Sequence, residues 1–348
     1  RDRSPSRGLG DVYKRQKVNV MIKKLTICIG CLLIVLFAAC QKESDVNTAE
    51  GRTSVNVVID LGQKAKSRYV DASQHEGIKT LRIVVSTGPK SIVYNKKYTA
   101  SELTPDADGK VTLTIPDVPI GIATFFAIGN EESIGKEYTT EVILDELEKG
   151  NQQFLFVDET KTYFPKTGPN IVDHGLPMSA TVGVSVVRNM APVNIELRRA
   201  VVKLNLIVEN GTTSDITLEK VNFGPFVGDR FYLFTDQTMD VPDGTQYGVL
   251  EFLDRHITIP GNQSTPKLAT YIYPTYAYKA GMGDNPYTIG LTTNVREYEP
   301  LVFGMGYNSF PRNTQVNITA RITTTAVIIL NFEVCKWDEY PVEVPPFE

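Results

Sequence analysis

Short segments in which apolar and polar residues alternate recur along most of this chain, and this pattern constrains its fold more than any other feature. The segment SVNVVIDL at 54–61 puts four apolar residues on one face, namely Val55, Val57, Ile59 and Leu61. Alternation with a period of two residues is typical of a β-strand that buries one face. The sequence therefore predicts a strand at 54–61 with one buried and one exposed side.

Similar segments follow in two sets. The first set comprises TLRIVVST, KSIVYNKKY, KVTLTIPDV and ATFFAIGN, which are separated by turn segments such as TGPK and PDADGK. A second set follows FPKTGPNIVDHGLP and includes TVGVSVV, VNIELRRAVVKLNLIVE, ITLEKVNF, QVNITARIT and AVIILNFEV. Many short strands with regular turn signals are typical of a β-sandwich or a β-barrel. Because each half has its own set, we place a domain boundary near Met190 to Pro192, which gives domains at 54–190 and 191–348.

One segment has a helical pattern instead. TTEVILDELEKG, at 139–150, puts Val142, Ile143 and Leu147 on one side of a helix and ends on Gly150, a common stop signal. The sequence thus predicts an all-β protein with one short helix.

An export signal precedes the strands. Met21 opens the segment MIKKLTICIGCLLIVLFAAC, whose apolar core is shorter than the roughly 20 residues that a membrane-spanning helix needs. The sequence predicts a signal peptide at 21–39 that is cleaved before Cys40. This arrangement resembles the lipobox of bacterial lipoproteins, in which the cysteine carries acyl chains. An ordinary signal peptide with an incidental cysteine is the alternative.

The residues on either side of the signal also carry expectations. We expect 40–53 to form a lipidated tether, because QKESD after Cys40 resembles the acidic export tags of surface lipoproteins in Bacteroidota, although a solvated linker has the same composition. The expected location is the outer membrane, exposed at the cell surface. Residues 1–20 have no strand or helix periodicity, and DVYKRQ resembles a translated sequencing-adapter end, so we treat 1–20 as a non-native leader.

Charge and motif content exclude several kinds of protein. Residues 1–39 hold eight Lys or Arg and two Asp or Glu, so their removal changes the formal charge from −4 to −10. That sign argues against nucleic acid or anionic lipid as a partner. Three histidines lie far apart, without the spacing of a metal site: His75, His174 and His256. We expect no enzyme, no metal and no cofactor, although a catalytic triad is recognised by geometry and not by sequence order.

Cysteines and aromatic residues leave two further questions. Cys28 and Cys31 form a CxxC inside the signal peptide, and we expect Cys335, on a strand, to be a small core residue.

A cluster of tyrosines in ATYIYPTYAYKAG could fill a core or form a platform for sugar rings: Tyr271, Tyr273, Tyr276 and Tyr278. We favour the core, because aromatic residues are common in strands, and we expect Trp337 to cap it. The platform would make the chain a surface glycan-binding lipoprotein.

Several segments together resemble the fimbrillins, which are pilus subunits of Bacteroidota. TIPDVPIGIATFFAIGN is similar to a hairpin and strand of the first fimbrillin domain, and HGLPMSA to the segment before the second. VNIELRRAVVKLNLIV, SFPRNTQVNITARI and FEVCKWDEYPVEV are similar to strands and the tryptophan-containing tail of that second domain. The resemblance covers essentially the whole mature chain. It implies two tandem transthyretin-like β-sandwich domains, a lipoprotein precursor, and a structural and adhesive role in fimbriae.

The resemblance also implies how the subunit assembles. In this family a protease with trypsin-like, arginine-directed preference cuts after the first strand, and a strand of a neighbouring subunit replaces it. Here the lost strand is 54–61, and Arg68 matches the cut position. Lys64 and Lys66 are alternative cut sites, and a loop that is never cut is a further alternative. The implied partners are other pilin subunits, an arginine-specific protease, the lipid anchor in the outer membrane, and a host or bacterial surface receptor.

The C-terminal segment DEYPVEVPPFE is a candidate donor strand. It puts Tyr340, Val342 and Val344 on one face, and two prolines end the run. The segment is short for a stalk subunit, which leaves open a role at the fimbrial tip. A chain that is not cut at Arg68 would stay tied to the membrane as an anchor, whereas a processed chain would join the fimbrium.

Overall fold

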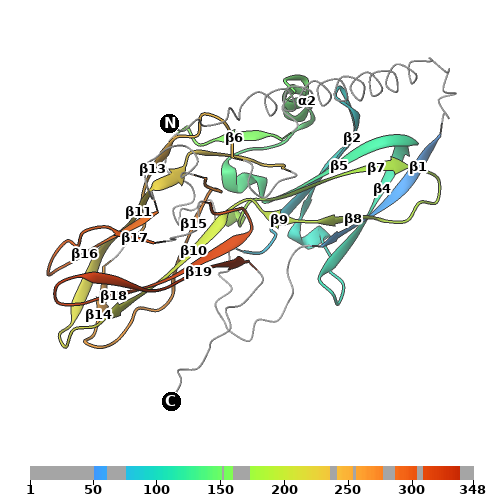
Figure 1. Cartoon of the computed structure of the whole chain (residues 1–348). Coiled ribbons are helices and arrows are strands. Elements are labelled where there is room, and N and C mark those ends of the chain that lie inside the picture. Colours follow the sequence, from blue (N-terminus) through green and yellow to red (C-terminus); the bar gives the residue numbers. More distant parts are fainter. Residues whose placement is uncertain are drawn as a thin grey trace, which may run out of the picture. The chain divides into compact units, whose positions relative to one another are not determined.

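The computed structural model describes residues 51–60, 76–150, 153–159, 173–235, 241–253, 256–276, 287–303 and 309–337. Within these ranges the chain is all-β with a single α-helix, as predicted (Figure 1). The strands form two β-sandwiches, one built mainly from each half of the chain.

The first sandwich consists of a five-stranded and a three-stranded sheet. Its strands are β1 (Arg52–Asp60), β2 (Thr80–Gly88), β3 (Ser91–Thr99), β4 (Lys110–Pro119), β5 (Gly121–Gly129), β7 (Met178–Val186), β8 (Val193–Glu196) and β9 (Arg198–Arg199). The five-stranded sheet has the order β3-β2-β5-β7-β9, and the three-stranded sheet has the order β4-β1-β8. Apolar residues of both sheets form one buried cluster between them.

The second sandwich consists of a four-stranded and a five-stranded sheet. Its strands are β10 (Val202–Asn210), β11 (Ile216–Gly228), β13 (Tyr247–Glu251), β14 (Ile257–Ile259), β15 (Leu268–Ile272), β16 (Thr288–Thr293), β17 (Leu301–Val302), β18 (Thr314–Ile322) and β19 (Val327–Lys336). The four-stranded sheet has the order β15-β10-β18-β19. The other has the order β13-β11-β16-β17, with β14 also paired to β11.

A third buried cluster joins the two sandwiches. It contains residues of β2 and β5, of the helix, and of the second half of the chain, among them Tyr271, Tyr273 and Trp337. A two-stranded sheet contributes to it, formed by β6 (Leu155–Val157) and β12 (Arg230–Tyr232). Two short 3-10 helices, η1 (Ala100–Glu102) and η2 (Glu131–Ile134), complete the described elements.

The residues of the two sandwich cores show where the first sandwich ends in the sequence and the second begins. The first core extends from Val55 to Leu197, and the second from Val202 to Val327. The boundary near Met190 to Pro192 stays a prediction about domains, and a boundary drawn between the cores would lie after Leu197. The segment TVGVSVV, which we assigned to the second set, lies largely in β7 of the first sandwich, so that assignment was wrong. The segment VNIELRRAVVKLNLIVE, also assigned to the second set, is split: β8 and β9 belong to sheets of the first sandwich, and only β10 belongs to the second.

The helix forms where the sequence predicts it, as α2 (Thr140–Glu148). The side chain of Thr139 caps its first turn by accepting a hydrogen bond from the backbone N–H of Val142. Ile143 and Leu147 are buried as predicted, but Val142 is 37% exposed, so its placement on the buried side was wrong. Val142 lies about 100° around the helix from Ile143, outside the stripe that Ile143 and Leu147 share. No helix among the described residues is long and apolar enough to cross a membrane.

Candidate functional site

The first strand is the centre of the candidate site, because it is inserted between two strands that do not pair with each other. β1 runs antiparallel to β4 from Arg52 to Asp60, and parallel to β8 from Val57 to Asp60. β8 has β1 as its only partner in the described three-stranded sheet. Figure 1 shows β1 as the blue strand beside β4 and β8. β1 is therefore the strand that joins β4 to β8.

The inner face of β1 is completely buried. Val55, Val57 and Ile59 are each 0% exposed and belong to the first core. Burial of such a side chain stabilises the fold by roughly 1.5–3 kcal/mol. The buried face that the alternation predicts is thus observed for these three residues, while Leu61 lies outside the described ranges. That these residues leave the fold by exchange stays a prediction.

The outer face of β1 makes only a few exposed polar contacts. Arg52 forms an ion pair of 2.8 Å with Asp117, and both side chains are exposed. Asn56 accepts a hydrogen bond of 3.0 Å from the hydroxyl of Thr114 on β4. Exposed pairs of this kind contribute about 0–1 kcal/mol. Apolar burial and the two backbone ladders are therefore what hold β1 in place.

Loss of β1 would leave a groove one strand wide. Neighbouring strands lie about 4.8 Å apart, so β4 and β8 are separated by about 10 Å and could not pair across the gap without moving. The groove would be lined by buried apolar residues of β4 and β8: Val111, Leu113, Ile115, Val193 and Ile195. A strand with apolar residues at alternate positions fits this lining. Sequence reasoning missed the role of β8, although its alternation at Val193 and Ile195 is visible, because parallel pairing over this distance leaves no local signal.

The other residues predicted for processing and exchange lie outside the described ranges. This applies to the lipidation residue, the cut site with its two alternatives, and the donor segment: Cys40, Arg68, Lys64, Lys66, Tyr340, Val342 and Val344. Glu76 is the first described residue after 61–75, and Trp337 is the last described residue of the chain. These two residues are in contact, since the indole N–H of Trp337 donates a 2.9 Å hydrogen bond to the Glu76 carboxylate. The residue that follows 61–75 in the sequence is therefore in contact with the residue that precedes 338–348.

The tyrosines predicted as either core or platform are divided by the structure. Tyr271 and Tyr273 are buried in the third cluster, and Tyr271 stacks on Trp337 with ring centroids 5.9 Å apart. Tyr276 is half-buried, and Tyr278 lies outside the described ranges. A sugar platform formed by all four tyrosines is thus wrong, because two of them fill the core.

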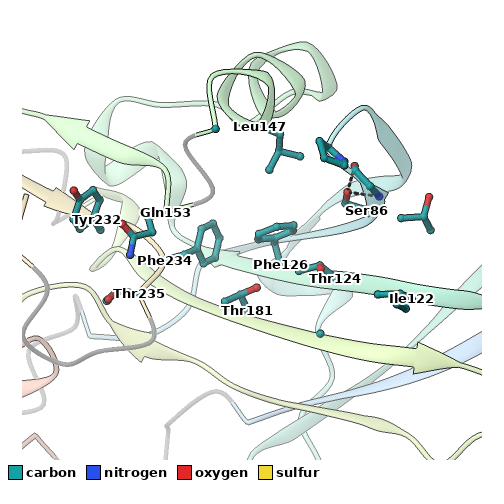
Figure 2. Close-up of a pocket in the computed structure, with 15 residues that line it drawn as sticks. Ser86, Ile122, Thr124, Phe126, Leu147, Gln153, Thr181, Tyr232, Phe234 and Thr235 are labelled. Atoms are coloured by element: carbon teal, nitrogen blue, oxygen red, sulfur yellow. Dashed lines mark hydrogen bonds between the residues drawn. The ribbon is translucent and has the colours of Figure 1, made fainter. Parts of the chain in front are cut away.

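An open groove lies on the outer face of β5 and β7. Its volume is about 780 Å³, and the described residues that line it are all uncharged. Figure 2 shows Leu147 above this face, Phe126 beside Phe234, and Thr124 and Thr181 beneath. Gly183 on β7 pairs with Thr124, and a Cβ at Gly183 would contact nothing within 4 Å. The described lining of this groove would suit an uncharged polar molecule.

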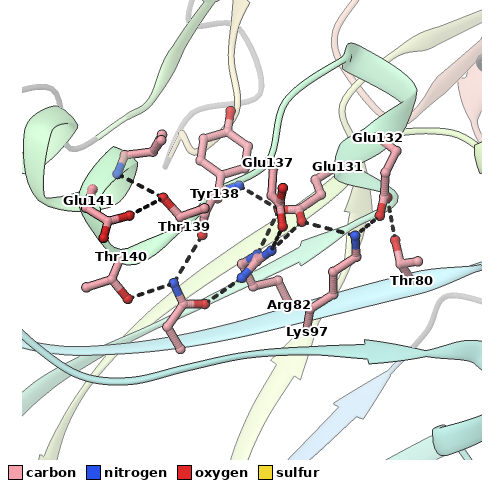
Figure 3. A network of polar contacts seen from close by, with 12 residues as sticks. Thr80, Arg82, Lys97, Glu131, Glu132, Glu137, Tyr138, Thr139, Thr140 and Glu141 are labelled. Carbon is pink, nitrogen blue, oxygen red and sulfur yellow. Dashed lines mark hydrogen bonds and ion pairs between the residues drawn. The ribbon is translucent and has the colours of Figure 1, made fainter.

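A network of charged residues holds the segment between β5 and α2 against β2 (Figure 3). We interpret this network as structural. Arg82 donates to both carboxylate oxygens of buried Glu131, at 2.6 and 2.8 Å. Glu131 also accepts from the backbone N–H of Tyr138, at 3.0 Å. Burial disfavours the charged form of Glu132, but hydrogen bonds from Lys97 and Thr80 outweigh it and lower the pKa of that carboxyl. Both carboxylates are thus bonded to cationic partners, Glu131 to Arg82 and Glu132 to Lys97. The described residues contain no group of three or more potential metal ligands.

Comparison with known proteins gives structural matches only. Neither protein-family models nor characterised proteins match the sequence. The tip fimbrial protein Mfa3 from Porphyromonas gingivalis, with a C-terminal truncation, is 12% identical and superposes with a TM-score of 0.54 over 82% of this chain and all of that one.

Two further solved structures match with TM-scores below 0.5. A fimbrilin from Porphyromonas gingivalis is 12% identical, with a TM-score of 0.49 over 82% of this chain and 97% of that one. A fimbrial assembly protein from Parabacteroides distasonis is also 12% identical, with a TM-score of 0.46 over 82% and 99%. The Mfa3 match carries the conclusion: the chain has the fold of a fimbrial protein, in agreement with its resemblance to the fimbrillins.

Proposed function

We propose that this protein is a structural and adhesive subunit of cell-surface fimbriae, which is exported as a lipoprotein and assembled by strand exchange. The observation that carries the proposal is the place of β1. It is the first described strand, it lies between β4 and β8, and residues 61–79, which include Arg68, separate it from β2.

The physical basis is the cost of an empty groove. Removal of β1 exposes the apolar side chains that face Val55, Val57 and Ile59, and it leaves the inner edges of β4 and β8 without backbone partners. Unpaired strand edges are templates for another strand, and addition of a strand is a recurrent way in which proteins join. A second subunit that supplies a strand restores both ladders and the buried area.

Processing follows from the order of the residues. A cut after Arg68 separates Cys40 and β1 from the body of the protein, so that the lipid tether leaves with the strand. The lipid then serves as a temporary anchor in the outer membrane, and an arginine-specific protease converts the precursor into a fibre subunit. A chain that is not cut remains an anchor, and a subunit whose tail is used differently occupies the tip.

The donor strand that we propose is the tail segment with Tyr340, Val342 and Val344. These side chains repeat the alternation of Val55, Val57 and Ile59. In the sequence the tail comes after β19, which is a strand of the second sandwich.

The test is digestion of the protein from Cys40 onward with an arginine-specific protease. We expect a new N-terminus at Tyr69 by mass spectrometry and a ladder of oligomers on an unboiled gel. Arg68→Ala should abolish both, whereas the matched variant Lys66→Ala should behave like the unmodified chain. A protein that resists cleavage, or one that is cut at Arg68 and stays monomeric, would contradict the proposal.

The uncharged groove on β5 and β7 favours a second function, the binding of a neutral glycan at the cell surface. The described part of its lining offers hydroxyls and aromatic rings and carries no charge. Thr124→Glu would place a carboxylate on the floor and should abolish retardation in a neutral polysaccharide gel, whereas the exposed Thr114→Glu should not. Absence of retardation in the unmodified chain would reject this function.

A further inference from the structure

A buried carboxylate joins the end of the loop to the start of the tail. The side chain of Glu76 accepts hydrogen bonds from Lys203 at 2.6 Å, from Trp337 at 2.9 Å and from the hydroxyl of Tyr271 at 3.4 Å. Glu76 and Lys203 are both largely buried. Burial disfavours ionisation of Glu76, but the charge of Lys203 and hydrogen bonds from Lys203 and Trp337 outweigh it and lower the pKa of that carboxyl. Glu76 is therefore a buried carboxylate with three hydrogen-bonding partners, all in the second half of the chain.

Trp337 is held from several directions. Its ring lies parallel to that of Tyr271, and the guanidinium of Arg199 lies 4.8 Å from its ring. Its backbone N–H donates to the carbonyl of Asn313 at 3.1 Å, and its carbonyl accepts from Gln315 at 2.6 Å. The backbone of Trp337 is thus fixed to the second sandwich, whereas its indole N–H contacts Glu76.

The backbone after Glu76 is fixed to the first sandwich. Asn130, at the end of β5, donates to the carbonyl of Gly77 at 3.0 Å and accepts from the N–H of Lys79 at 2.8 Å. The chain then enters β2 at Thr80. None of these contacts involves residues 61–75. A cut in the loop therefore leaves Glu76 attached to the first sandwich.

We propose that Glu76 is a positioning residue, which fixes the start of the C-terminal tail relative to the groove that β1 occupies. The inference rests on the proposed function. In a fibre built by strand exchange, each subunit receives a strand in its first sandwich and supplies one from the end of its second. The distance and angle between these two places set the repeat of the fibre. Glu76 connects them directly, because its backbone belongs to one sandwich and its carboxylate to the tryptophan at the start of the tail.

The first part of the test uses Trp337 as a probe, since it is the only tryptophan in the chain. Glu76→Gln should shift its emission to longer wavelength and increase its quenching by acrylamide. The matched control is Glu209→Gln, which removes a carboxylate from β10 that pairs with Arg321 at 2.6 Å, away from Trp337. It should leave both properties unchanged. Unchanged emission and quenching in Glu76→Gln would overturn the inference.

A second variant guards against loss of folding. Glu76→Gln leaves Lys203 as a buried charge without its anionic partner, so we also combine Glu76→Gln with Lys203→Met, which removes that charge. This double variant should keep the far-ultraviolet circular dichroism of the unmodified chain and still show the shifted emission. Native emission in the double variant would mean that the carboxylate does not position Trp337.

The second part of the test compares fibres after cleavage at Arg68. Glu76→Gln should still give a ladder on an unboiled gel, because its groove is intact, but its fibres should have a shorter persistence length and more variable subunit spacing in electron micrographs. Equal persistence length and spacing in Glu76→Gln and the unmodified chain would overturn the inference. Absence of a ladder in the unmodified chain would instead reject the proposed function, and the fluorescence result would still stand.

Discussion

β1 and β10 hold the same place in the two sandwiches but are attached to the molecule very differently. Each pairs antiparallel with one neighbour and parallel with another: β1 with β4 and β8, and β10 with β15 and β18. β10 pairs with β18 over its full length, Val202–Asn210, whereas β1 pairs with β8 only from Val57 to Asp60. The two strands thus have the same kinds of neighbours, but the parallel ladder is short at β1 and long at β10.

β1 and β10 also differ in how many of their faces are buried and in how the chain continues after them. β1 is buried on one face, whereas β10 also buries Lys203 and Asn205 on its other face. The connection after β10 is tight, because the side chain of Asn210 donates to the carbonyls of Ser214 and Ile259, at 2.8 and 2.9 Å. If β1 is exchanged as we propose, a central position does not by itself make a strand permanent. We then expect the number of buried faces and the way the strand ends are tied to decide which strand is exchanged.

The largest expected effect comes from cutting the chain after each of the two strands. A recognition sequence for a specific protease, inserted between Thr213 and Ser214 in the Arg68→Ala background, should allow cleavage without loss of β10. Cleavage after Arg68 in the unmodified chain should release the fragment that carries β1. Size-exclusion chromatography with mass spectrometry measures both. Release of the β10 fragment under native conditions would remove the distinction between the two strands.

The next largest expected effect is on stability, and it concerns β18, the parallel neighbour of β10. Arg312, just ahead of β18, donates from its guanidinium to the carbonyls of Arg198, Arg199 and Leu233 and to the hydroxyl of Ser179, at 2.8–3.2 Å. Burial, with a smaller contribution from Arg198, lowers the pKa of Arg312 to about 10, so it remains charged at neutral pH.

Loss of this anchor should be costly. Arg312→Met leaves buried acceptors without their donor and should lower the free energy of unfolding by about 3–5 kcal/mol, as for other buried charged groups that lose their partners. Arg321→Met, which breaks an exposed ion pair with Glu209, should cost about 0–1 kcal/mol. Urea denaturation measures both. Equal losses would show that β18 is not held by Arg312.

A third prediction compares core residues of the two strands. Ile59→Ala and Leu204→Ala should each cost about 2–5 kcal/mol in the uncut protein, since both side chains are almost completely buried. After cleavage at Arg68, Ile59→Ala should speed the release of the β1 fragment by about 30-fold or more, because each 1.4 kcal/mol is a factor of ten. Leu204→Ala should leave that rate unchanged. A similar acceleration by both would mean that β1 leaves only when the whole protein unfolds.

The smallest effect is the pH dependence at the junction of the sandwiches. The pKa of Glu76 is lowered from 4.5, so its contribution to stability is present above about pH 4.5 and is lost as the pH falls through the lower folded value. The charged groups that face it are Lys203 and Arg199. The difference in unfolding free energy between the unmodified chain and Glu76→Gln should therefore be constant from pH 7 to about 5 and shrink below that. Thermal denaturation measures it, and a constant difference down to strongly acid pH would contradict the assignment.

Local patterns in the sequence predicted the strands and the helix. The alternation at 54–61 identified the buried residues of β1, because a period of two residues maps directly onto one face of a strand. The spacing of Ile143 and Leu147 identified the buried side of α2. Val142 was misplaced, because a helix this short buries only a narrow stripe.

Contacts between distant residues could not be predicted in this way. The pairing of β8 with β1 joins residues about 135 positions apart, and Glu76 meets Trp337 across 261 positions. Such contacts depend on how strands are ordered in the sheets, which a single sequence leaves open. The segment HEGIK gave no sign that its glutamate would be buried, and Arg312 was visible only as part of a segment similar to the fimbrillins.

The two ladders along β1 also have a mechanical consequence. A strand that occupies this groove lies between β4 and β8 with its backbone hydrogen bonds roughly perpendicular to its length. Tension along the strand therefore acts on all of these bonds in shear at once, and they cannot open one after another as in a zipper that is pulled apart from one end. A fibre held together at this groove would resist flow at the cell surface through many weak bonds that share the force.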